Sequence, residues 1–339
     1  MKTKSLIIVL VSLIACTGAG SVGPSTEVSL DGLRTFSDIA GSVKTVNKSP
    51  RPYAVTIHPD GHLLILEHGP IAVVKIHPIT GKRVVLSDFT HGAGPLPDNL
   101  WGIAELGDGR IVSGTQGNLS IPRSIIVIDP ITGNRNILSA ATRDGEYGKG
   151  PGFSIPNNVV VQPNGRLALT DSGFATNAVI EVDPATGDRR IISDATHGTG
   201  PELKGPVGIT VARDGFLFVV DAGLKTIVKV DPNTGDRAIL SDTTHGTGTP
   251  FDVPTALALL LEQQLAVADK GLKAILVVDL KIGNRTILSD AAHGQGPEIH
   301  SSTSVAYHPH GYLVALDPFF KTVFRIDVTT GNRTIIFKY

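Results

Sequence analysis

The stretch VDPNTGDRAILSDTTHGTGTP (Val230–Pro250) decides the fold, because the chain repeats it. Similar stretches begin at Ile76, Ile128, Val182 and Val278, and a partial copy, IDVTTGNRTIIFKY, closes the sequence. The glycine of the Gly-x-Arg element recurs after 52, 54, 48, 48 and 48 residues, at Gly81, Gly133, Gly187, Gly235, Gly283 and Gly331. Self-similarity of this period is typical of propellers, solenoids and repeat arrays. The stretch is therefore first a structural unit, and a functional site is expected where the copies differ.

Each repeat divides into four short apolar segments. In the unit that begins at Pro206 they are VGITVA, FLFVVD, TIVKVD and RAILSD, and clusters of Gly, Asp, Asn and Pro separate them. Segments of this length, rich in β-branched residues and bounded by turn residues, predict strands. The first two are almost wholly apolar, whereas the last two admit Lys229, Arg237 and Asp242. This gradient predicts a four-stranded sheet whose inner strands are buried and whose outer strand meets water.

Six such units predict an all-β fold, a six-bladed β-propeller of four-stranded antiparallel blades over residues 51–339. A linear β-solenoid is the alternative, although its coils are usually much shorter than 48 residues. Two segments compete for the outer strand of the blade that closes the ring. They are Gly32–Asp38, which resembles Gly283–Asp290, and Arg333–Tyr339. The sequence leaves open which of them pairs.

Residues 1–20 predict a signal peptide, because two lysines precede the apolar run LIIVLVSLIA (Leu6–Ala15), which is too short to span a bilayer. LIAC (Leu13–Cys16) resembles the bacterial lipobox, whose cysteine becomes the lipidated first residue of the mature protein. Residues 21–50 then form a tether that contains the extra outer-strand-like segment. The expected location is the bacterial cell envelope, periplasmic or at the cell surface, with a lipid on Cys16. Ordinary cleavage near Gly18–Gly20 would instead give a secreted protein.

Composition excludes several kinds of partner. Cys16 is the only cysteine, so no disulfide forms within the mature chain. Without Lys2 and Lys4, the 30 Lys and Arg residues become 28 against 31 Asp and Glu, which leaves a net charge of −3. No basic stripe marks a nucleic-acid-binding face. We expect no nucleic-acid partner, and contact with a membrane only through the lipid anchor.

Two sets of polar residues recur at fixed places and are predicted to belong to the scaffold. Acids end the second strand of five units, at Glu67, Asp171, Asp221, Asp269 and Asp317. Turn aspartates commonly accept hydrogen bonds from nearby backbone amides, and acids spaced one to a blade do not converge on a metal. Histidines follow the outer strand, without the spacing of a metal site, at His91, His197, His245 and His293.

Two units resemble known propeller families. Pro206–Asp221, with the pattern Pro-x-Gly-Ile-x-Val-x-x-Asp-Gly-x-Leu-x-Val-x-Asp, resembles NHL-type repeats. PNNVVVQPNGRLALTDSG (Pro156–Gly173) is similar to the gluconolactonase and senescence-marker family of six-bladed propellers. The similarity covers roughly residues 51–339. It implies a divalent cation such as calcium at the channel mouth, held by a glutamate, asparagines and an aspartate from different blades.

Only Asn157 matches that implied ligand set. Alignment of the units places six residues at the start of the first strands, namely Tyr53, Trp101, Asn157, Val207, Thr255 and Thr303. Calcium prefers several oxygen ligands, carboxylates among them, and this ring supplies no acid. The sequence therefore favours a non-catalytic recognition scaffold for a protein, peptide or glycan, with no cofactor. The alternative is a metal-dependent lactonase or hydrolase that uses the divalent cation.

The second unit breaks the repeat pattern. The loop after its second strand, Gly114–Ser124, is longer than in the other units, and Gly114 takes the place of the usual acid. The loop into the third unit, Ser139–Ile155, is also longer and lacks the Ser-Asp-x-Thr-His-Gly element. Both loops are expected beside the channel mouth, and loop insertions on a repeat scaffold often carry function. The predicted binding site over blades 2 and 3 comprises Asp98, Asn99, Trp101, Arg123, Arg143, Tyr147 and Asn157.

Replacing Cys16 tests the lipid anchor. The wild-type protein, expressed with its leader in a bacterium, should fractionate with membranes, because the several acyl chains of a lipoprotein anchor far more stably than one. Cys16→Ser should appear in the soluble fraction, as measured by immunoblotting and by the mass of the mature N-terminus. Unchanged processing and fractionation of the variant would contradict the prediction.

Overall fold

The computed structural model describes residues 49–142, 144–173, 176–261 and 263–339. Every element named below belongs to the second of the two units of the chain, Asn47–Tyr339. The predicted signal peptide, Cys16, the segment Gly32–Asp38 and most of the tether lie outside the described residues, as does Arg143.

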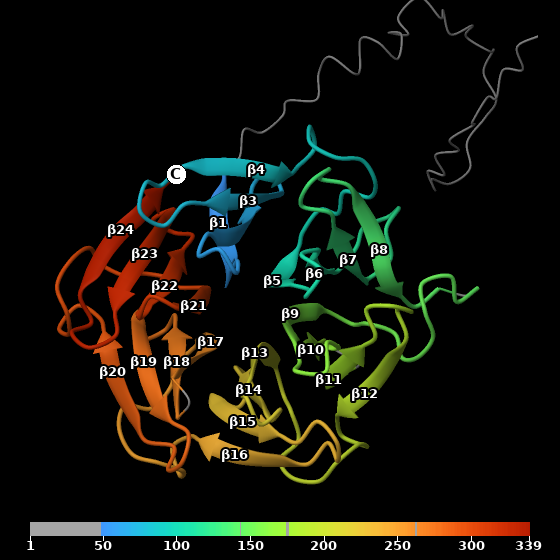
Figure 1. The fold of residues 1–339 in the computed structure, drawn as a ribbon. Helices are drawn as coiled ribbons and strands as arrows, with labels where there is room; N and C mark the ends of the chain where they lie inside the picture. Colours follow the sequence, from blue (N-terminus) through green and yellow to red (C-terminus); the bar gives the residue numbers. More distant parts are fainter. Residues whose placement is uncertain (1–48, 143, 174–175, 262) are drawn as a thin grey trace, which may run out of the picture. The chain divides into compact units, whose positions relative to one another are not determined.

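The second unit is a six-bladed β-propeller, as predicted. Twenty-four strands form six antiparallel sheets, each from four consecutive strands. The first strand of each sheet lies nearest the centre of the ring and the fourth strand lies at its rim (Figure 1). In the part of the chain that the structure describes, no helix is long and apolar enough to cross a membrane.

The strands of the six blades have the following bounds. Blade 1 comprises β1 (Arg51–Ile57), β2 (Leu63–His68), β3 (Ala72–Ile76) and β4 (Arg83–Ser87), and blade 2 comprises β5 (Trp101–Glu105), β6 (Ile111–Thr115), β7 (Ser124–Ile128) and β8 (Arg135–Ala140). Blade 3 comprises β9 (Pro156–Val161), β10 (Leu167–Ser172), β11 (Asn177–Val182) and β12 (Arg189–Ser193), and blade 4 comprises β13 (Pro206–Val211), β14 (Leu217–Asp221), β15 (Thr226–Val230) and β16 (Arg237–Ser241). Blade 5 comprises β17 (Pro254–Leu261), β18 (Gln264–Asp269), β19 (Ala274–Asp279) and β20 (Arg285–Ser289), and blade 6 comprises β21 (Ser304–His308), β22 (Tyr312–Asp317), β23 (Thr322–Asp327) and β24 (Arg333–Lys338).

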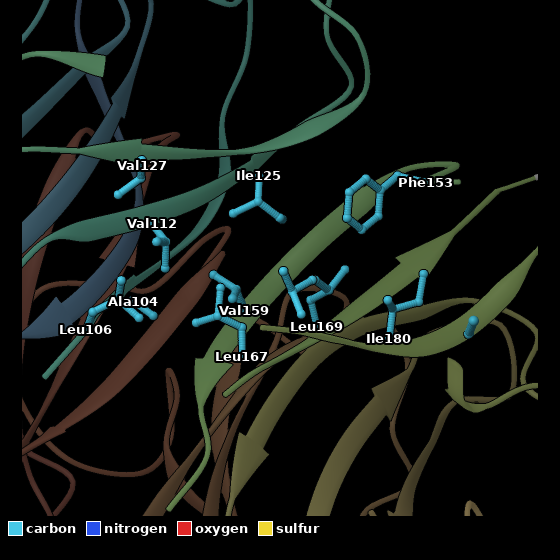
Figure 2. Close-up of a cluster of buried hydrophobic side chains, with 12 residues drawn as sticks. Ala104, Leu106, Val112, Ile125, Val127, Phe153, Val159, Leu167, Leu169 and Ile180 are labelled. Carbon is cyan, nitrogen blue, oxygen red and sulfur yellow. The ribbon is translucent and has the colours of Figure 1, made fainter. Parts of the chain in front are cut away.

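Apolar side chains fill the interfaces between neighbouring blades. Successive side chains of a strand point to opposite faces, so a strand buried on both sides needs an unbroken apolar run. In β14, Leu217 and Val219 pack in a cluster shared with blade 3, whereas Phe218 and Val220 pack in a cluster shared with blade 5. Each of the six interfaces has a cluster of this kind among the described residues. Figure 2 shows the one between blades 2 and 3.

The outer strands are joined by the arginine of the repeated Gly-x-Arg element. Arg285 begins β20, and its Nη1 donates to Ser241 Oγ (2.6 Å) and to the His245 carbonyl (3.0 Å) at the end of blade 4. Its Nε donates to the Thr249 carbonyl (2.9 Å), and Ser241 Oγ donates in turn to the Gly283 carbonyl (2.6 Å). We call these bonds between consecutive blades the latch.

The latch recurs around the ring with a buried arginine each time. Burying a guanidinium is costly unless its N–H groups find acceptors, and the latch supplies them as carbonyl and hydroxyl oxygens. At the remaining interface Arg83 instead pairs with Glu67 of its own blade (Nη2 to Oε2, 2.6 Å). The arginine–serine pairs of the latch are Arg135–Ser87, Arg189–Ser139, Arg237–Ser193, Arg285–Ser241 and Arg333–Ser289.

A glycine lets each latch close. Gly246 follows His245 and has a φ of 74°, in the left-handed region that favours glycine. A Cβ at this position would lie 2.1 Å from the carbonyl oxygen of Gly283 in the next blade. A larger residue would therefore push the loop away from its neighbour, which explains why the Thr-His-Gly element accompanies the Gly-x-Arg element in the sequence.

Asp242 and His245 of the opening stretch hold their own loop, as predicted. Asp242 Oδ1 accepts the backbone amides of Thr244 (2.6 Å) and His245 (2.7 Å) and lies 3.0 Å from His245 Nδ1. Burial by itself raises the pKa of Asp242, but hydrogen bonds from Thr244 and His245 outweigh it and lower the pKa to about 2. The carboxylate therefore stays charged and bound within the loop, which leaves it no part in chemistry.

Four of the five acids at the ends of the second strands cap loops, as predicted, whereas Glu67 instead pairs with Arg83. Asp317 accepts the backbone amides of His300, Ser301, Phe319 and Phe320 at 2.6 to 3.0 Å. It therefore ties the loop that enters blade 6 to the loop that follows β22. Asp171, Asp221 and Asp269 accept amides in the corresponding loops.

The last blade is completed by the C-terminal segment. β24 pairs with β23, so Arg333–Lys338 supplies the outer strand of blade 6. Blade 6 meets blade 1 through hydrogen bonds between their first strands: Thr303 Oγ1 donates to the Tyr53 carbonyl (2.9 Å), and the Val55 amide donates to Ser304 Oγ (3.1 Å).

Replacing the arginine of a latch by lysine should destabilise the propeller. Arg285→Lys keeps the charge but cannot satisfy three separated acceptors, so we expect the free energy of unfolding to fall by about 2–4 kcal/mol. Urea denaturation followed by circular dichroism measures the change. Arg110→Lys, which alters an exposed pair with Asp108, is the matched control and should cost less than about 1 kcal/mol. Equal effects of the two substitutions would contradict the role of the latch.

Candidate functional site

The mouth of the central channel contains a cavity of about 600 Å³. It lies where the first strands begin and the second strands end, which is the same edge of every blade because the two strands are antiparallel. Each blade offers two positions there, the start of its first strand and the residue after its second-strand acid. The lining at the first position is Tyr53, Trp101, Asn157, Val207, Thr255 and Thr303, and at the second it includes His68, Ala222, Lys270 and Pro318.

Three rings pack together on one side of the cavity, and we call them the aromatic group. His68 stacks on Tyr53 with ring centroids 4.0 Å apart, and Trp101 meets both edge-on at 5.2 and 5.7 Å. Aromatic pairs favour such stacked and edge-to-face arrangements. The group forms a rigid apolar wall contributed by blades 1 and 2.

The protonation states of the aromatic group follow from its surroundings. His68 Nε2 lies 2.7 Å from the Leu100 carbonyl, which can only accept, so this nitrogen carries the hydrogen. Burial lowers the pKa of His68 and keeps the ring neutral. Burial also raises the pKa of Tyr53 to about 12, so its hydroxyl stays protonated.

Trp101 has an unsatisfied donor. Its indole Nε1 is buried and has no hydrogen-bond partner among the described residues. An unpaired buried donor costs about 1–3 kcal/mol, so Trp101 is held in place by the packing of its ring rather than by a hydrogen bond. Unsatisfied polar atoms of this kind are uncommon in folded chains and mark positions retained for reasons other than stability.

Polar side chains from other blades complete the wall. Asn157 Nδ2 donates to Ser172 Oγ (2.6 Å), and Thr255 Oγ1 donates to the Ser302 carbonyl (2.9 Å). Because the hydroxyl hydrogen of Thr255 is used between blades, its oxygen presents only lone pairs to the cavity. Arg51 and Lys270 are the charged residues of the lining, which contains no carboxylate.

The cavity does not fit the divalent cation that gluconolactonase-type propellers imply. Within the described ranges, no group of three or more His, Cys, Asp or Glu side chains could hold a metal ion. Asn157 and Asn158 are the lining residues of the expected kind, and a cation at this place would lie in a cavity whose charged groups are both positive.

The structure brings together two of the seven residues predicted for the site. Trp101 and Asn157 both line the cavity, and the other four predicted residues that the structure describes are not among its lining. Asn99 Oδ1 instead accepts the Gln116 amide (3.3 Å), while Asp98 Oδ1 accepts Asn118 Nδ2 (3.4 Å). These two residues therefore hold the long loop of blade 2.

Arg123 and Tyr147 lie in the two unusual loops. Arg123 is exposed, and its charge acts on the carboxyl of Asp171. The backbone carbonyl of Tyr147 accepts Arg189 Nη1 (3.0 Å), so Tyr147 replaces the histidine of the latch between blades 2 and 3. Arg143 lies outside the described residues.

One sequence assignment in blade 2 is wrong by a residue. Thr115, not Gly114, occupies the position of the second-strand acid, since it ends β6 opposite Ser124 just as Asp221 ends β14 opposite Thr226. Thr115 Oγ1 accepts the Gly117 amide (2.9 Å), so a hydroxyl caps the loop where the other blades use a carboxylate.

Among the lining residues that the sequence analysis missed are the two cations and the imidazole of the wall, Arg51, Lys270 and His68. A signal for two of them was present. His68 and Lys270 each follow the repeated acid directly, at a position that holds a different residue in every unit. The variable position next to a repeated one was therefore as informative as the start of the first strand.

The opposite end of the channel has a second cavity, of about 800 Å³. Its wall consists mainly of the last residues of the first strands, among them Tyr307. His58 Nδ1 lies 2.8 Å from both carboxylate oxygens of Glu105 at this end, which joins blades 1 and 2. This pair holds the imidazole and the carboxylate of that wall to each other, whereas the first cavity presents cations with no carboxylate in its wall, so the first cavity is the better candidate site.

Comparisons with known proteins place the chain by fold. No protein-family model and no curated protein matches it. Among solved structures, a gluconolactonase from Xanthomonas campestris is similar at 14% identity and a TM-score of 0.60, covering 89% of this chain and 93% of that one. A virginiamycin B lyase from Staphylococcus aureus reaches 14% and 0.58, covering 86% and 85%. An auxiliary nutrient binding protein from Bacteroides thetaiotaomicron reaches 12% and 0.56, covering 80% and 68%. The resemblance to gluconolactonase-type propellers is thus confirmed for the fold, whereas the NHL resemblance stays a prediction.

Asp171 holds the loop that leads to Asn157. Its carboxylate accepts the amides of Ser154 (2.8 Å) and Ile155 (2.6 Å). Complete burial raises the pKa of Asp171 to about 6, in spite of these bonds and of the nearby charge of Arg123. The carboxyl therefore changes charge close to neutral pH.

This shift predicts a pH-dependent stability. The folded pKa of about 6 exceeds the unfolded 3.8, so the folded chain holds the proton more tightly. The stabilisation is complete below about pH 3.8 and is lost as the pH rises through about 6. Relative to Asp171→Asn, the free energy of unfolding of the wild type should fall by up to about 3 kcal/mol between pH 3.5 and pH 7.

Urea denaturation across this pH range measures the difference. Asp214→Asn, in an exposed hairpin turn, is the control, and its pH profile should follow the wild type. An Asp171→Asn profile parallel to the wild type would contradict the burial argument.

Proposed function

We propose that this chain is an exported, lipid-anchored binding protein of the bacterial cell envelope that holds a glycan at the channel mouth without transforming it. The lining of the cavity carries the proposal. The repeated scaffold does not fix which side chains stand at the channel mouth, and these side chains differ from blade to blade. One side of the wall is aromatic, and Asn157, Thr255 and Thr303 place amide and hydroxyl groups elsewhere in it.

Glycans suit this wall better than peptides or proteins. A cavity of about 600 Å³ is of the size that holds a small ligand of one or two rings. Sugar rings have an apolar face and a rim of hydroxyls, which match the aromatic group and the acceptors of Thr255 and Asn157. The fold of the auxiliary nutrient binding protein from Bacteroides thetaiotaomicron is compatible with such a role.

The lactonase alternative lacks support in the cavity. Hydrolysis by a bound cation needs ligands that fix the metal and leave it open positions. Analysis of the purified protein for metals separates the two functions. A stoichiometric divalent ion that a chelator removes would contradict the binding proposal and favour the metal-dependent lactonase.

The single tryptophan makes the test site-specific. Trp101 is the only tryptophan in the chain and lines the cavity, so its emission reports on the mouth alone. We expect a saturable change in emission with at least one member of a panel of mono- and disaccharides, at dissociation constants in the micromolar to millimolar range. Tyr53→Ala should weaken the binding at least about tenfold, because it removes one wall of the aromatic group.

Tyr307→Ala is the matched control, because Tyr307 lines the cavity at the other end of the channel. It should leave the titration unchanged. A response to peptides but to no saccharide, or equal effects of the two tyrosine substitutions, would contradict glycan binding at the mouth.

A further inference from the structure

We infer that the ligand of the channel mouth is an acidic sugar, whose ring packs on the aromatic group and whose carboxylate is bound by Arg51 and Lys270. The inference rests on the proposed function and names the class of its ligand. It comes from the charges of the cavity wall, which the choice of a glycan by itself does not explain.

Both charged groups of the wall are cations without an anion. Among the described residues, neither the guanidinium of Arg51 nor the ammonium of Lys270 forms an ion pair or a side-chain hydrogen bond, and both residues are exposed. Lys225 on the neighbouring loop pairs with Asp252 (2.9 Å). Arg51 and Lys270 instead line the cavity, where no carboxylate of the wall faces them.

Nearby carboxylates are already used by the scaffold. Asp269 directly precedes Lys270, but it is fully buried and accepts the amides of Asp252, Val253 and Leu272. Asp252 is bound to Lys225 and is not part of the lining. A carboxylate on the ligand would supply the missing counter-charge, through the charge-assisted hydrogen bonds that an arginine fork makes well.

The register of blade 1 places cation and rings together. Arg51 lies opposite His68 in the pairing of β1 with β2, and His68 stacks on Tyr53. A sugar ring against the aromatic group would therefore present a substituent toward Arg51. Lys270, from blade 5, lines the same cavity, so the wall offers the carboxylate of a ligand one cation from blade 1 and one from blade 5.

The chain as a whole does not attract anions. Its mature net charge of −3, after removal of Lys2 and Lys4, repels them at a distance. Any preference for an acidic over a neutral sugar must then arise from local groups, and salt should weaken it.

The test compares pairs of sugars that differ only in one acid group. Glucuronic acid against glucose, and galacturonic acid against galactose, are titrated by Trp101 emission and by calorimetry. We expect the acidic member of at least one pair to bind about tenfold or more tightly, as two charge-assisted hydrogen bonds allow. Arg51→Gln and Lys270→Gln should each reduce that preference, measured as the ratio of the affinities for the acidic and the neutral sugar.

Lys225→Gln, on the neighbouring loop, is the matched control and should keep the full preference. Thermal melts confirm that each variant folds. Equal affinity of the wild type for acidic and neutral sugars would overturn this inference and leave glycan binding intact. Failure of every saccharide to bind would instead overturn the proposed function, and the inference with it.

Discussion

The latch between outer strands is the constraint on which the rest of the structure depends. Each buried arginine must find several acceptors, and it finds them only at the end of the preceding blade. The outer strands β8, β12, β16 and β20 thus each donate at one end and accept at the other. The loop after it must also contain a glycine so that it can approach the next blade. These demands apply to each unit in turn, which is the physical reason that the rim of the propeller repeats so faithfully in the sequence.

The side chains at the channel mouth do not take part in the hydrogen bonds of the latch. A side chain at the start of a first strand faces the channel and the corresponding residues of other blades, so its identity does not affect the latch. Here the chain places a tyrosine, a tryptophan and a histidine on one side, and an arginine and a lysine near them. The repeat explains the fold, and the departures from it at the mouth define the site. The orphaned donor of Trp101 agrees with this division, since the ring is retained at a place where stability alone would not favour it.

The fold could be predicted from the sequence because its signals are local and repeated. Strand lengths, turn glycines and capping acids recur in every unit, so an ambiguity in one unit is settled by the others. The site could be predicted only in part, because its residues come from separate blades. The repeat period shows which residues lie at the same distance from the channel axis. It does not show which side chains meet across the channel. Arg51 and Lys270, from blades 1 and 5, line one cavity only when the ring closes.

The sequence prediction for blade 2 is wrong by one residue for a related reason. Its insertions blur the alignment, and an error of one residue exchanges the two faces of a strand. For this reason the sequence predicts Gly114, rather than Thr115, at the position of the second-strand acid. The long loops that contain Arg123 and Tyr147 were predicted to be functional because they are insertions. The Tyr147 carbonyl instead accepts a hydrogen bond of the latch. An altered loop in a repeat protein can preserve the structural contact of the loop it replaces, and only the three-dimensional arrangement separates this case from a functional insertion.

A crystal structure of the mature protein with a bound uronic acid would test the central claim most directly. The account predicts density for the sugar at the channel mouth, with its ring against Tyr53 and Trp101 and its carboxylate within hydrogen-bond distance of Arg51 and Lys270. Density for the sugar in the loops of blade 2 away from the cavity, or a metal ion beside Asn157 that binds the sugar itself, would contradict it.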